Sequence, residues 1–190
     1  AGAGAAGGAI IGKAAGGTAE GAIIGAAVGG AAGAIIGNQM DKKAEELDKE
    51  LENAEVERVG EGIKITFDGG LLFDFDSAAL RDRARTNLRE FATRMQDFED
   101  TRILVVGHTD AKGAADYNRD LSERRADAAA AFLMEQGVAA DRIVSVGRGE
   151  TEPVATNETE AGRQKNRRVE VAIYANEEYR ERVQAQTQGR

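Results

Sequence analysis

The sequence predicts an α/β sandwich, with two helices on one face of a single sheet and a glycine-rich segment in front of it. Two observations support this fold class. From about residue 59 to residue 175, strand-like apolar segments alternate with amphipathic helical segments. Residues 1–38 are instead mostly glycine, alanine and isoleucine, so the 190-residue chain is predicted to hold one folded domain with an N-terminal attachment.

The net charge and the absence of cysteine argue against several classes of function. The net charge of −8 argues against a nucleic-acid partner, because such binding depends on Lys and Arg neutralising backbone phosphates. The chain has no cysteine, which excludes thiolate zinc sites, disulfides and a cysteine nucleophile within it. The sequence begins at Ala1 rather than Met, so we expect a leader or further residues to precede it.

Glycines recur at helical spacing in the N-terminal segment. Residues 1–37 contain thirteen glycines, and from Gly17 to Gly37 every fourth residue is one. A short unit also repeats, as Ala9-Ile10-Ile11-Gly12, Ala22-Ile23-Ile24-Gly25 and Ala34-Ile35-Ile36-Gly37. Such a stripe of small residues lets helix backbones approach closely in a bilayer. In water the same glycines would cost a helix on the order of 13 kcal/mol relative to alanine, so lipid or tight self-packing must compensate.

Three interpretations fit this segment. Residues 21–37 carry no charge over seventeen positions, and such a helix is roughly 25 Å long, against a hydrocarbon core of about 30 Å. It is either one short membrane span, a hairpin of two short helices that turns near Lys13 and Glu20, or a flexible Gly/Ala linker. Because the isoleucine pairs keep register with the glycines, we favour a membrane-associated or self-packing segment over residues 1–38.

A connecting helix is predicted over residues 39–58. Its apolar or small residues step by four, three, four and three, at Met40, Ala44, Leu47, Leu51 and Ala54. This is a seven-residue repeat, but it covers only about two heptads. We therefore expect a spacer between the glycine segment and the domain, with at most weak self-association.

The domain over residues 59–175 reads β-α-β-α-β-loop-β. Strands are predicted at residues 63–67, 102–107, 142–147 and 168–174, and helices at residues 79–98 and 122–136. An extended piece over residues 73–77 leads into the first helix. A polar loop over residues 149–162, with a short helical turn after Thr159, precedes the last strand. Residues 176–190 are polar and predicted to be frayed.

The candidate site is an acid and an arginine fifteen positions apart. Asp110 follows a central strand, where α/β sheets usually place their sites, and Arg125 lies in the next helix. A carboxylate and a guanidinium at one site suit a zwitterion, whose ammonium meets Asp110 and whose carboxylate meets Arg125. The alternative is a salt bridge that only ties the loop to the helix, and spacing alone favours it.

The sequence supports a functional role less strongly for the other polar residues. His108 is the only histidine and has no second imidazole or thiol nearby, so we expect a hydrogen bond that orients the loop rather than a metal site. Asp74 and Asp76 alternate on an extended segment and are expected to point to opposite faces, not to form an acid/base pair. The cluster Asn166-Arg167-Arg168 is either a solvated face or a cation at the rim of the site. No catalytic residue and no cofactor are expected.

Several motifs together resemble the OmpA-like C-terminal domain, over about residues 63–174. They are Phe73-Asp74-Phe75-Asp76-Ser77-Ala78, Gly107-His108-Thr109-Asp110, Tyr117-Asn118 with Leu121-Ser122 and Arg125-Ala126, Gly147 with Gly149-Glu150 and Pro153, and Asn157 through Asn166-Arg167-Arg168-Val169-Glu170. The N-terminal part resembles the glycine-zipper segment of Gram-negative outer-membrane OmpA-family lipoproteins. In those proteins a lipid-bearing cysteine would precede the segment.

The resemblance implies non-covalent binding of peptidoglycan through the diaminopimelate of its stem peptide. It implies an outer-membrane location on the periplasmic face, where the protein tethers the membrane to the wall, and self-association through the zipper. Asp110 and Arg125 become the ligand pair rather than a salt bridge, and the residues expected to line the pocket are Thr109, Asn118, Leu121, Arg168, Phe75 and Asp76. A membrane assembly or pore component anchored by the domain is one alternative. A peptidoglycan hydrolase acting through Asp74, Asp76 or Asp110 is the remote one.

Overall fold

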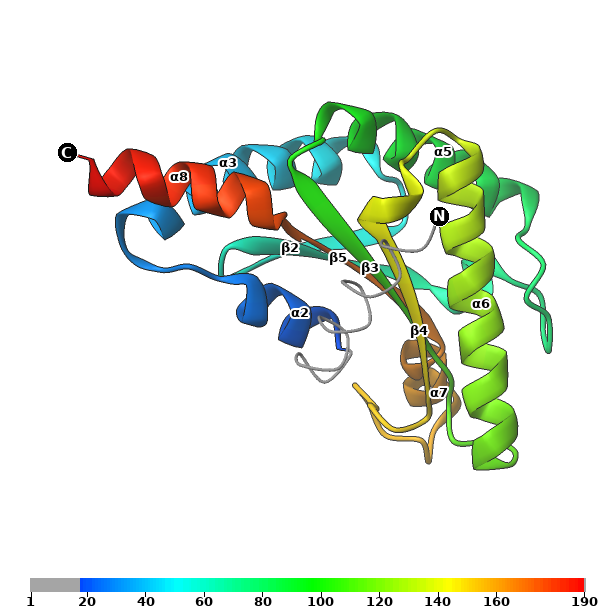
Figure 1. The fold of residues 1–190 in the computed structure, drawn as a ribbon. Coiled ribbons are helices and arrows are strands. Elements are labelled where there is room, and N and C mark those ends of the chain that lie inside the picture. The colour runs from blue at the N-terminus through cyan, green and yellow to red at the C-terminus, as the bar shows by residue number, and fades with distance from the viewer. Residues whose placement is uncertain (1–17, 190) are drawn as a thin grey trace.

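One mixed sheet of five strands organises the part of the chain that the computed structural model describes, residues 18–189 (Figure 1). Its strands are β1 (Ala54–Val59), β2 (Gly62–Asp68), β3 (Thr101–His108), β4 (Ile143–Gly149) and β5 (Arg168–Ala175). Their order across the sheet is β1-β2-β5-β3-β4. Strands β3 and β4 are parallel, and the other neighbours are antiparallel. The predicted α/β sandwich is confirmed, with one strand more than expected.

Seven α-helices and a 3-10 turn accompany the sheet within the described residues. They are α2 (Ala19–Ala26), α3 (Gly30–Glu50), α4 (Gly69–Leu72), α5 (Asp82–Asp97), α6 (Ala115–Glu135), α7 (Glu160–Asn166), α8 (Glu177–Gln188) and the turn Ala140–Arg142. Helix α6 begins seven residues before its predicted start at Ser122. Its first turns are largely polar and exposed, so the apolar periodicity that marks a helix becomes visible only from Leu121.

The main core lies on one face of the sheet, beneath α3, α5, α6 and α8 (Figure 1). Strand alternation sends Ile103 and Val105 of β3 to this face. The largest fully buried side chains here include Phe67 and Phe91, whose rings meet edge to face with centroids 6.5 Å apart. The end of β3 lies close against α6, because a Cβ atom on Gly107 would come within 2.1 Å of the Ser122 carbonyl oxygen, and the candidate site residues lie at this end.

The second face of the sheet is covered by α2. The small residues of this helix and Ile23 pack on side chains of β3 and β5, and the cluster comprises Ala19, Ala22, Ile23, Ala26, Leu104, Val106, Ala172 and Tyr174. Figure 1 shows α2 across the sheet from α3 and α5. The glycine segment is therefore in part an element of the folded domain.

The predicted connecting helix is wrong at its end. Helix α3 stops at Glu50, and residues 54–59 form β1, paired with β2 through a turn at Gly60 and Glu61. Val56 packs toward the core while Glu55 and Glu57 are exposed, which is strand alternation rather than a heptad. The heptad seam of α3 does exist, but it is buried in the domain core, through Met40, Ala44, Leu47 and Leu51.

The C-terminal residues also differ from the prediction of a frayed tail. Residues 177–188 form α8, whose N-cap Asn176 accepts a hydrogen bond from the Tyr179 N–H at 2.8 Å. Tyr179 and Val183 are buried against the core, and α8 lies beside α3 (Figure 1). Two apolar anchors four residues apart were enough to dock a helix whose remaining surface is polar.

The glycine segment is described only from residue 18. Predictions for residues 1–17, including a turn near Lys13, lie outside the described residues. Glu20 lies in the first turn of α2 rather than in a hairpin turn, and the break between α2 and α3 falls at residues 27–29. Across residues 18–189, none of the helices combines the length and the apolar character that crossing a membrane requires.

Candidate functional site

A cavity of about 370 Å³ opens beyond the C-terminal end of β3, between α6, α7 and the segment that follows α4. We call it the Asp110 cavity. Seven of the eight predicted site residues line it, namely Thr109, Asp110, Asn118, Leu121, Arg125, Phe75 and Asp76. Arg168 does not, and Arg167 lines the cavity in its place.

Asp110 is held in position by its backbone neighbours. The Thr109 N–H donates to the Gly149 carbonyl at 2.9 Å, and the Asn118 amide donates to the Asp110 carbonyl at 3.2 Å. The Lys112 N–H donates to Asp110 Oδ1 at 2.9 Å. With Asp110 only 7 % exposed, these bonds fix where its carboxylate points, toward the cavity.

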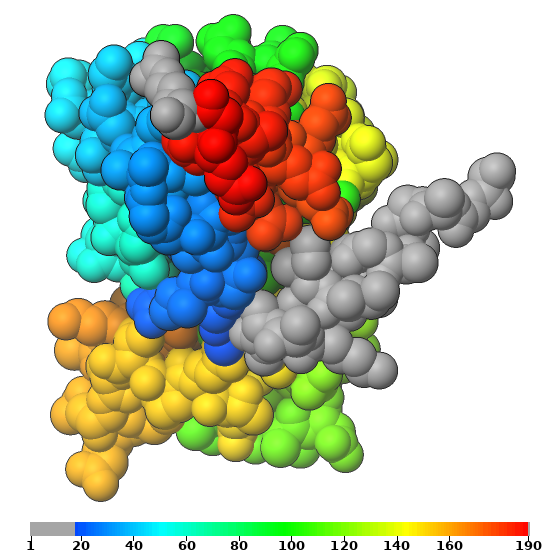
Figure 2. All heavy atoms as spheres, turned by 60° about the vertical axis from the view of Figure 1, so that its left-hand side comes forward, coloured from blue at the N-terminus to red at the C-terminus, as the bar shows by residue number. Residues whose placement is uncertain are grey.

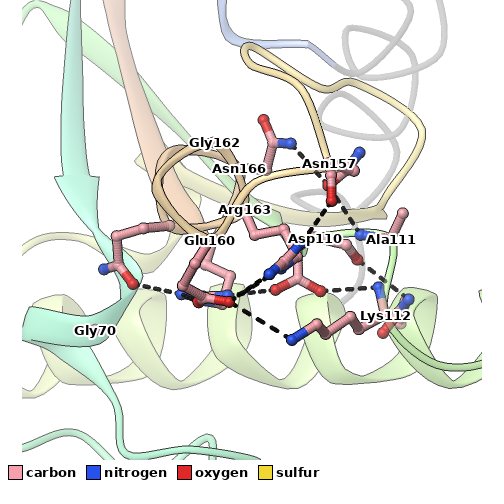
Figure 3. A network of polar contacts seen from close by, with 12 residues as sticks. Gly70, Asp110, Ala111, Lys112, Asn157, Glu160, Gly162, Arg163 and Asn166 are labelled. Carbon is pink, nitrogen blue, oxygen red and sulfur yellow. Dashed lines mark hydrogen bonds and ion pairs between the residues drawn. The ribbon is translucent and has the colours of Figure 1, made fainter.

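Arg167 is the functional neighbour that sequence reasoning missed. Its Nη1 donates to Asp110 Oδ2 at 2.5 Å, and its Nη2 donates to Glu160 Oε1 at 2.8 Å. Figure 3 shows Asp110, Lys112 and Glu160 gathered at this point. Hydrogen bonds from Arg167 and Arg163 lower the pKa of Glu160 to about 2. The rim cation expected from the Asn166-Arg167-Arg168 cluster is thus Arg167.

Arg125 is a buried cation that forms no salt bridge with a carboxylate of the described residues. Its Nε donates to the Ser77 carbonyl at 2.9 Å, its Nη2 donates to the Asp74 carbonyl at 3.4 Å, and its guanidinium lies 5.2 Å from the Phe73 ring centroid. No carboxylate among residues 18–189 forms a salt bridge with it, so the alternative Asp110–Arg125 bridge is not formed. Burial lowers the pKa of Arg125, and the charges of Asp76 and Asp110 nearby oppose this shift without overcoming it.

Thr109 adds an unused polar group to the same cavity. Its side-chain oxygen is buried and has no hydrogen-bond partner among the described residues. Asn118 differs, because its amide already bonds the Asp110 carbonyl and Glu150 Oε2, the latter at 2.5 Å. Thr109 is therefore available to a ligand, whereas Asn118 supports the loop.

The opposite lip is formed by the residues after α4. Phe75 is 99 % exposed, and Asp76 accepts a hydrogen bond from the Tyr117 hydroxyl. Asp76 has a φ of 57°, so the backbone turns here instead of running extended. Asp74 and Asp76 border the same cavity, and the expectation that they point to opposite faces is wrong, because residues two apart on an extended segment share one face.

Arg168 lies outside the Asp110 cavity and pairs with an acid of its own strand. It is the first residue of β5, and its Nε donates to Glu170 Oε1 at 2.7 Å within a buried ion pair. Burial would raise the pKa of Glu170, but His108 and Arg168 beside it lower that pKa to about 2. Strand alternation explains why Arg167 rather than Arg168 lines the Asp110 cavity, since successive residues at the start of β5 point to opposite sides.

His108 does not make the loop-orienting hydrogen bond that we expected. Its ring is fully buried between two acids, with Nε2 3.7 Å from Glu170 and Nδ1 3.9 Å from Glu152, and neither nitrogen has a hydrogen-bond partner among the described residues. Thr109 and Asn118 orient the loop instead. Over residues 18–189, no group of three His, Asp or Glu side chains is arranged to hold a metal ion.

Comparison with known proteins identifies two matching families. The model of the OmpA family matches residues 72–167, and a glycine zipper model matches residues 1–44. The chain is 45 % identical over 103 residues to outer membrane porin F of Pseudomonas fluorescens, covering 54 % of this chain and 32 % of the relative. It is 36 % identical over 143 residues to the probable lipoprotein YiaD of Escherichia coli, covering 74 % of this chain and 65 % of the relative.

A third relative and two solved structures extend the comparison. The peptidoglycan-binding protein ArfA of Mycobacterium tuberculosis is 38 % identical over 105 residues, covering 55 % of this chain and 32 % of the relative. The cell wall anchor of the T6SS from Pseudomonas aeruginosa matches with a TM-score of 0.63 and 33 % identity, over 72 % of this chain and 97 % of that one. The peptidoglycan-associated lipoprotein of Burkholderia pseudomallei matches with a TM-score of 0.51 and 32 % identity, over 54 % and 87 %. The chain spans about a third to two thirds of the length of the curated relatives named here.

Proposed function

Because this chain belongs to the OmpA family, we propose that its domain binds peptidoglycan non-covalently and holds the diaminopimelate of a stem peptide in the Asp110 cavity. The free end of diaminopimelate carries one ammonium and one carboxylate. Relatives and structural neighbours described as peptidoglycan-binding or as cell wall anchors support the polymer as the ligand. The cavity volume of about 370 Å³ is suited to such a small head group rather than to a whole sugar-peptide repeat.

The observation that carries the proposal is that Arg125 is buried and forms no salt bridge among residues 18–189. A buried guanidinium without a carboxylate is costly to maintain, and a ligand carboxylate would offset that cost. Backbone carbonyls and the Phe73 ring hold Arg125 at the wall of the cavity. A charge-assisted hydrogen bond formed in this dry setting is stronger than one at the surface.

The ammonium of the ligand would meet Asp110. Each carboxylate oxygen can accept more than one hydrogen bond, and Oδ1 and Oδ2 of Asp110 have Lys112 N–H and Arg167 Nη1 as their partners. The unused hydroxyl of Thr109 would add a further acceptor. Acid and guanidinium come from different elements, the end of β3 and α6, so they bracket a zwitterion from two sides.

Co-sedimentation with purified sacculi tests the site. We expect Asp110→Ala and Arg125→Ala to abolish sedimentation that the unmodified chain shows. Arg124→Ala is the matched control, because Arg124 neighbours Arg125 on α6 but pairs with Asp120 at 2.6 Å on the surface. Equal sedimentation of all four proteins would place binding elsewhere.

Soluble stem peptides identify the ligand group. A peptide with lysine in place of diaminopimelate keeps the ammonium but lacks the carboxylate that Arg125 would bind. We expect it to bind about a hundred-fold more weakly, as for loss of one charge-assisted pair. The difference should largely vanish in Arg125→Ala, and a preference that survives this substitution would contradict the assignment.

Binding requires no bond cleavage, which distinguishes it from the hydrolase alternative. Asp74 lies 3.5 Å from Arg81, and Asp76 accepts the Tyr117 hydroxyl, so both acids already have partners. We expect sacculi incubated with the protein to release no soluble fragments. Release that Asp74→Ala or Asp76→Ala abolishes would establish the hydrolase instead.

The N-terminal segment would attach the protein to the outer membrane on its periplasmic face. The glycine zipper match over residues 1–44 and the named outer-membrane and lipoprotein relatives support this part of the proposal. Self-association through the zipper, for a tether or for a membrane assembly, is the second candidate. Residues 1–17 include none of the described elements, so they are removed for this test, and an unchanged particle size in detergent would argue against zipper-driven assembly in that part.

A further inference from the structure

The second face of the sheet is shaped to receive α2. The start of β2 has a glycine, Gly62, where a Cβ atom would lie 2.6 Å from the Ile173 carbonyl oxygen of β5 and 2.7 Å from Ile23 Cγ2. Ile23 therefore fits a notch that any larger residue would fill. Around it, the alanines of α2 lie on Leu104, Val106, Ala172 and Tyr174.

Polar contacts hold the end of α2 to the domain. Glu61, in the turn between β1 and β2, accepts the Val28 N–H at 2.9 Å and the Gly29 N–H at 2.7 Å. Lys64 Nζ lies 2.9 Å from Glu20 Oε1 at the other end of the helix. The Glu61 carboxylate thus binds the backbone between α2 and α3, at the start of α3, where a negative charge is favourable.

Helix α2 is held much less firmly than α3. It has eight residues and one large buried side chain, whereas α3 has twenty-one residues and buries Ile36, Met40 and Leu47. A helix of eight residues is marginal in water without its docking surface. Between the two helices, Gly29 and Gly30 have φ values of 68° and 61° and provide a hinge. Helix α2 can therefore leave the sheet while α3 stays packed.

After Glu20, the surface that α2 and the start of α3 turn outward is uncharged. Ile24 is 65 % exposed and Ile35 is 41 % exposed, within a run from Gly21 to Gly37 that has no ionisable side chain. Figure 2 shows these two helices at the surface beside α8. An apolar, charge-free surface of this kind favours contact with lipid over contact with water.

We propose that the second face of the sheet is a docking surface that α2 occupies in water and leaves when a lipid surface takes up the glycine segment, with Glu61 as the latch. Docking hides the apolar residues of both partners while no membrane is near. Departure exposes Ala172 and its neighbours on β3 and β5, which gives a direct way to detect the undocked state. The inference rests on the proposed membrane attachment but not on the proposed peptidoglycan site.

Single cysteines test the proposal, because the chain has none of its own. Ala172→Cys places a thiol beneath α2, and Ala92→Cys places one in α5 on the opposite face of the sheet, each at a fully buried alanine. Labelling rates are measured for both variants of the full chain, alone and with vesicles of phosphatidylethanolamine and phosphatidylglycerol. We expect vesicles to speed labelling at position 172 by about ten-fold or more and to leave position 92 unchanged, as for local opening.

The latch is tested in the same assay without lipid. Glu61→Gln should raise labelling at position 172 several-fold, whereas Glu55→Gln, at an exposed position of β1, should not. Vesicle co-sedimentation is recorded in the vesicle-containing samples of the first labelling assay. Protein that sediments while position 172 stays protected overturns the undocking alone, and protein that does not sediment overturns the membrane attachment as well. Labelling that rises equally at positions 172 and 92 reports global unfolding and also overturns the proposal. If labelling at position 172 rises with protein concentration but not with vesicles, the lipid proposal is wrong and a second copy of the chain displaces α2 instead.

Discussion

Arg125 and Arg168 are two arginines with nearly equal burial and opposite circumstances. They are 6 % and 5 % exposed. Arg168 has the Glu170 carboxylate at 2.7 Å, whereas Arg125 has only backbone carbonyls and a ring. The paired arginine contributes to folding, and the unpaired one is left with a charge that a ligand can neutralise. Burial alone therefore does not distinguish the two arginines, and the lack of a salt bridge to Arg125 among residues 18–189 is what supports the proposal that it binds a ligand.

The largest expected effect is on the paired arginine. Glu170→Gln leaves the Arg168 guanidinium buried without its acid, and we expect the free energy of unfolding to fall by about 3 kcal/mol. Urea denaturation measures this change. Binding to sacculi should remain, because Glu170 lies outside the Asp110 cavity. The control Glu55→Gln, at an exposed position, should change stability little, and an equal loss there would remove the contrast between paired and unpaired charges.

Lowering the pH should reduce the free energy of unfolding of the unmodified chain by a similar amount. The pKa of Glu170 is about 2 in the folded state against 4.5 for an ordinary glutamate, so it is lowered by folding. A lowered pKa contributes stability that is fully present above pH 4.5 and is lost as the pH falls toward 2. The loss expected over this window is about 3 kcal/mol. In Glu170→Gln the acid limb of the stability curve should be flatter, and identical acid limbs would contradict the assignment.

Arg125 should show the reverse pattern. Arg125→Gln is expected to weaken binding of a diaminopimelate stem peptide about a hundred-fold, equal to about 2.7 kcal/mol. Stability should stay within about 1 kcal/mol, because no partner carboxylate is left unpaired. Calorimetry of binding and urea denaturation give the two values. A large loss of stability with unchanged binding would make Arg125 a structural residue like Arg168.

The sequence predicted the site better than its surroundings. The structure brings Asp110 and Arg125 to one cavity, as their residue types suggested, although their spacing alone favoured a salt bridge and the family resemblance was needed to prefer a ligand pair. Arg167 was missed in favour of Arg168, because their roles depend on where α7 ends and β5 begins. Alternation separates the two only once that boundary is known, and adjacent arginines in a sequence do not mark it.

The elements that the sequence did not predict lie toward the two ends of the domain. The central elements were predicted from strong apolar patterns, but β1 and α8 each turn only two apolar residues toward the main core, Ala54 and Val56 in β1 and Tyr179 and Val183 in α8. Short amphipathic elements of this kind are stabilised by the surface they dock on rather than by their own pattern. The docking of α2 on the sheet was likewise beyond pattern reading, because the glycine spacing describes one face of the helix and Ile23 anchors another.

Arg167 offers an intermediate test, since it pairs with the ligand-binding acid itself. Arg167→Gln removes the partner of Asp110 Oδ2 and leaves the Lys112 N–H to orient the carboxylate. We expect stem-peptide affinity to fall about ten-fold, equal to about 1.4 kcal/mol. Lys165→Gln, also near the end of α7, is the control. A gain in affinity would show that Arg167 competes with the ligand ammonium instead of positioning Asp110.

The smallest expected effect is at Phe75, the exposed lip of the cavity. Its side chain is 99 % exposed without ligand, so Phe75→Ala should leave the free energy of unfolding unchanged. A bound head group would cover part of the ring, and we expect affinity to fall about three-fold, equal to about 0.7 kcal/mol. Tryptophan at the same position should keep or improve binding, because it retains an apolar surface at the rim. Unchanged affinity in Phe75→Ala would leave the charges of Asp110 and Arg125 as the whole source of binding, and a loss as large as that of Arg125→Gln would mean that the apolar lip, not the unpaired cation, dominates.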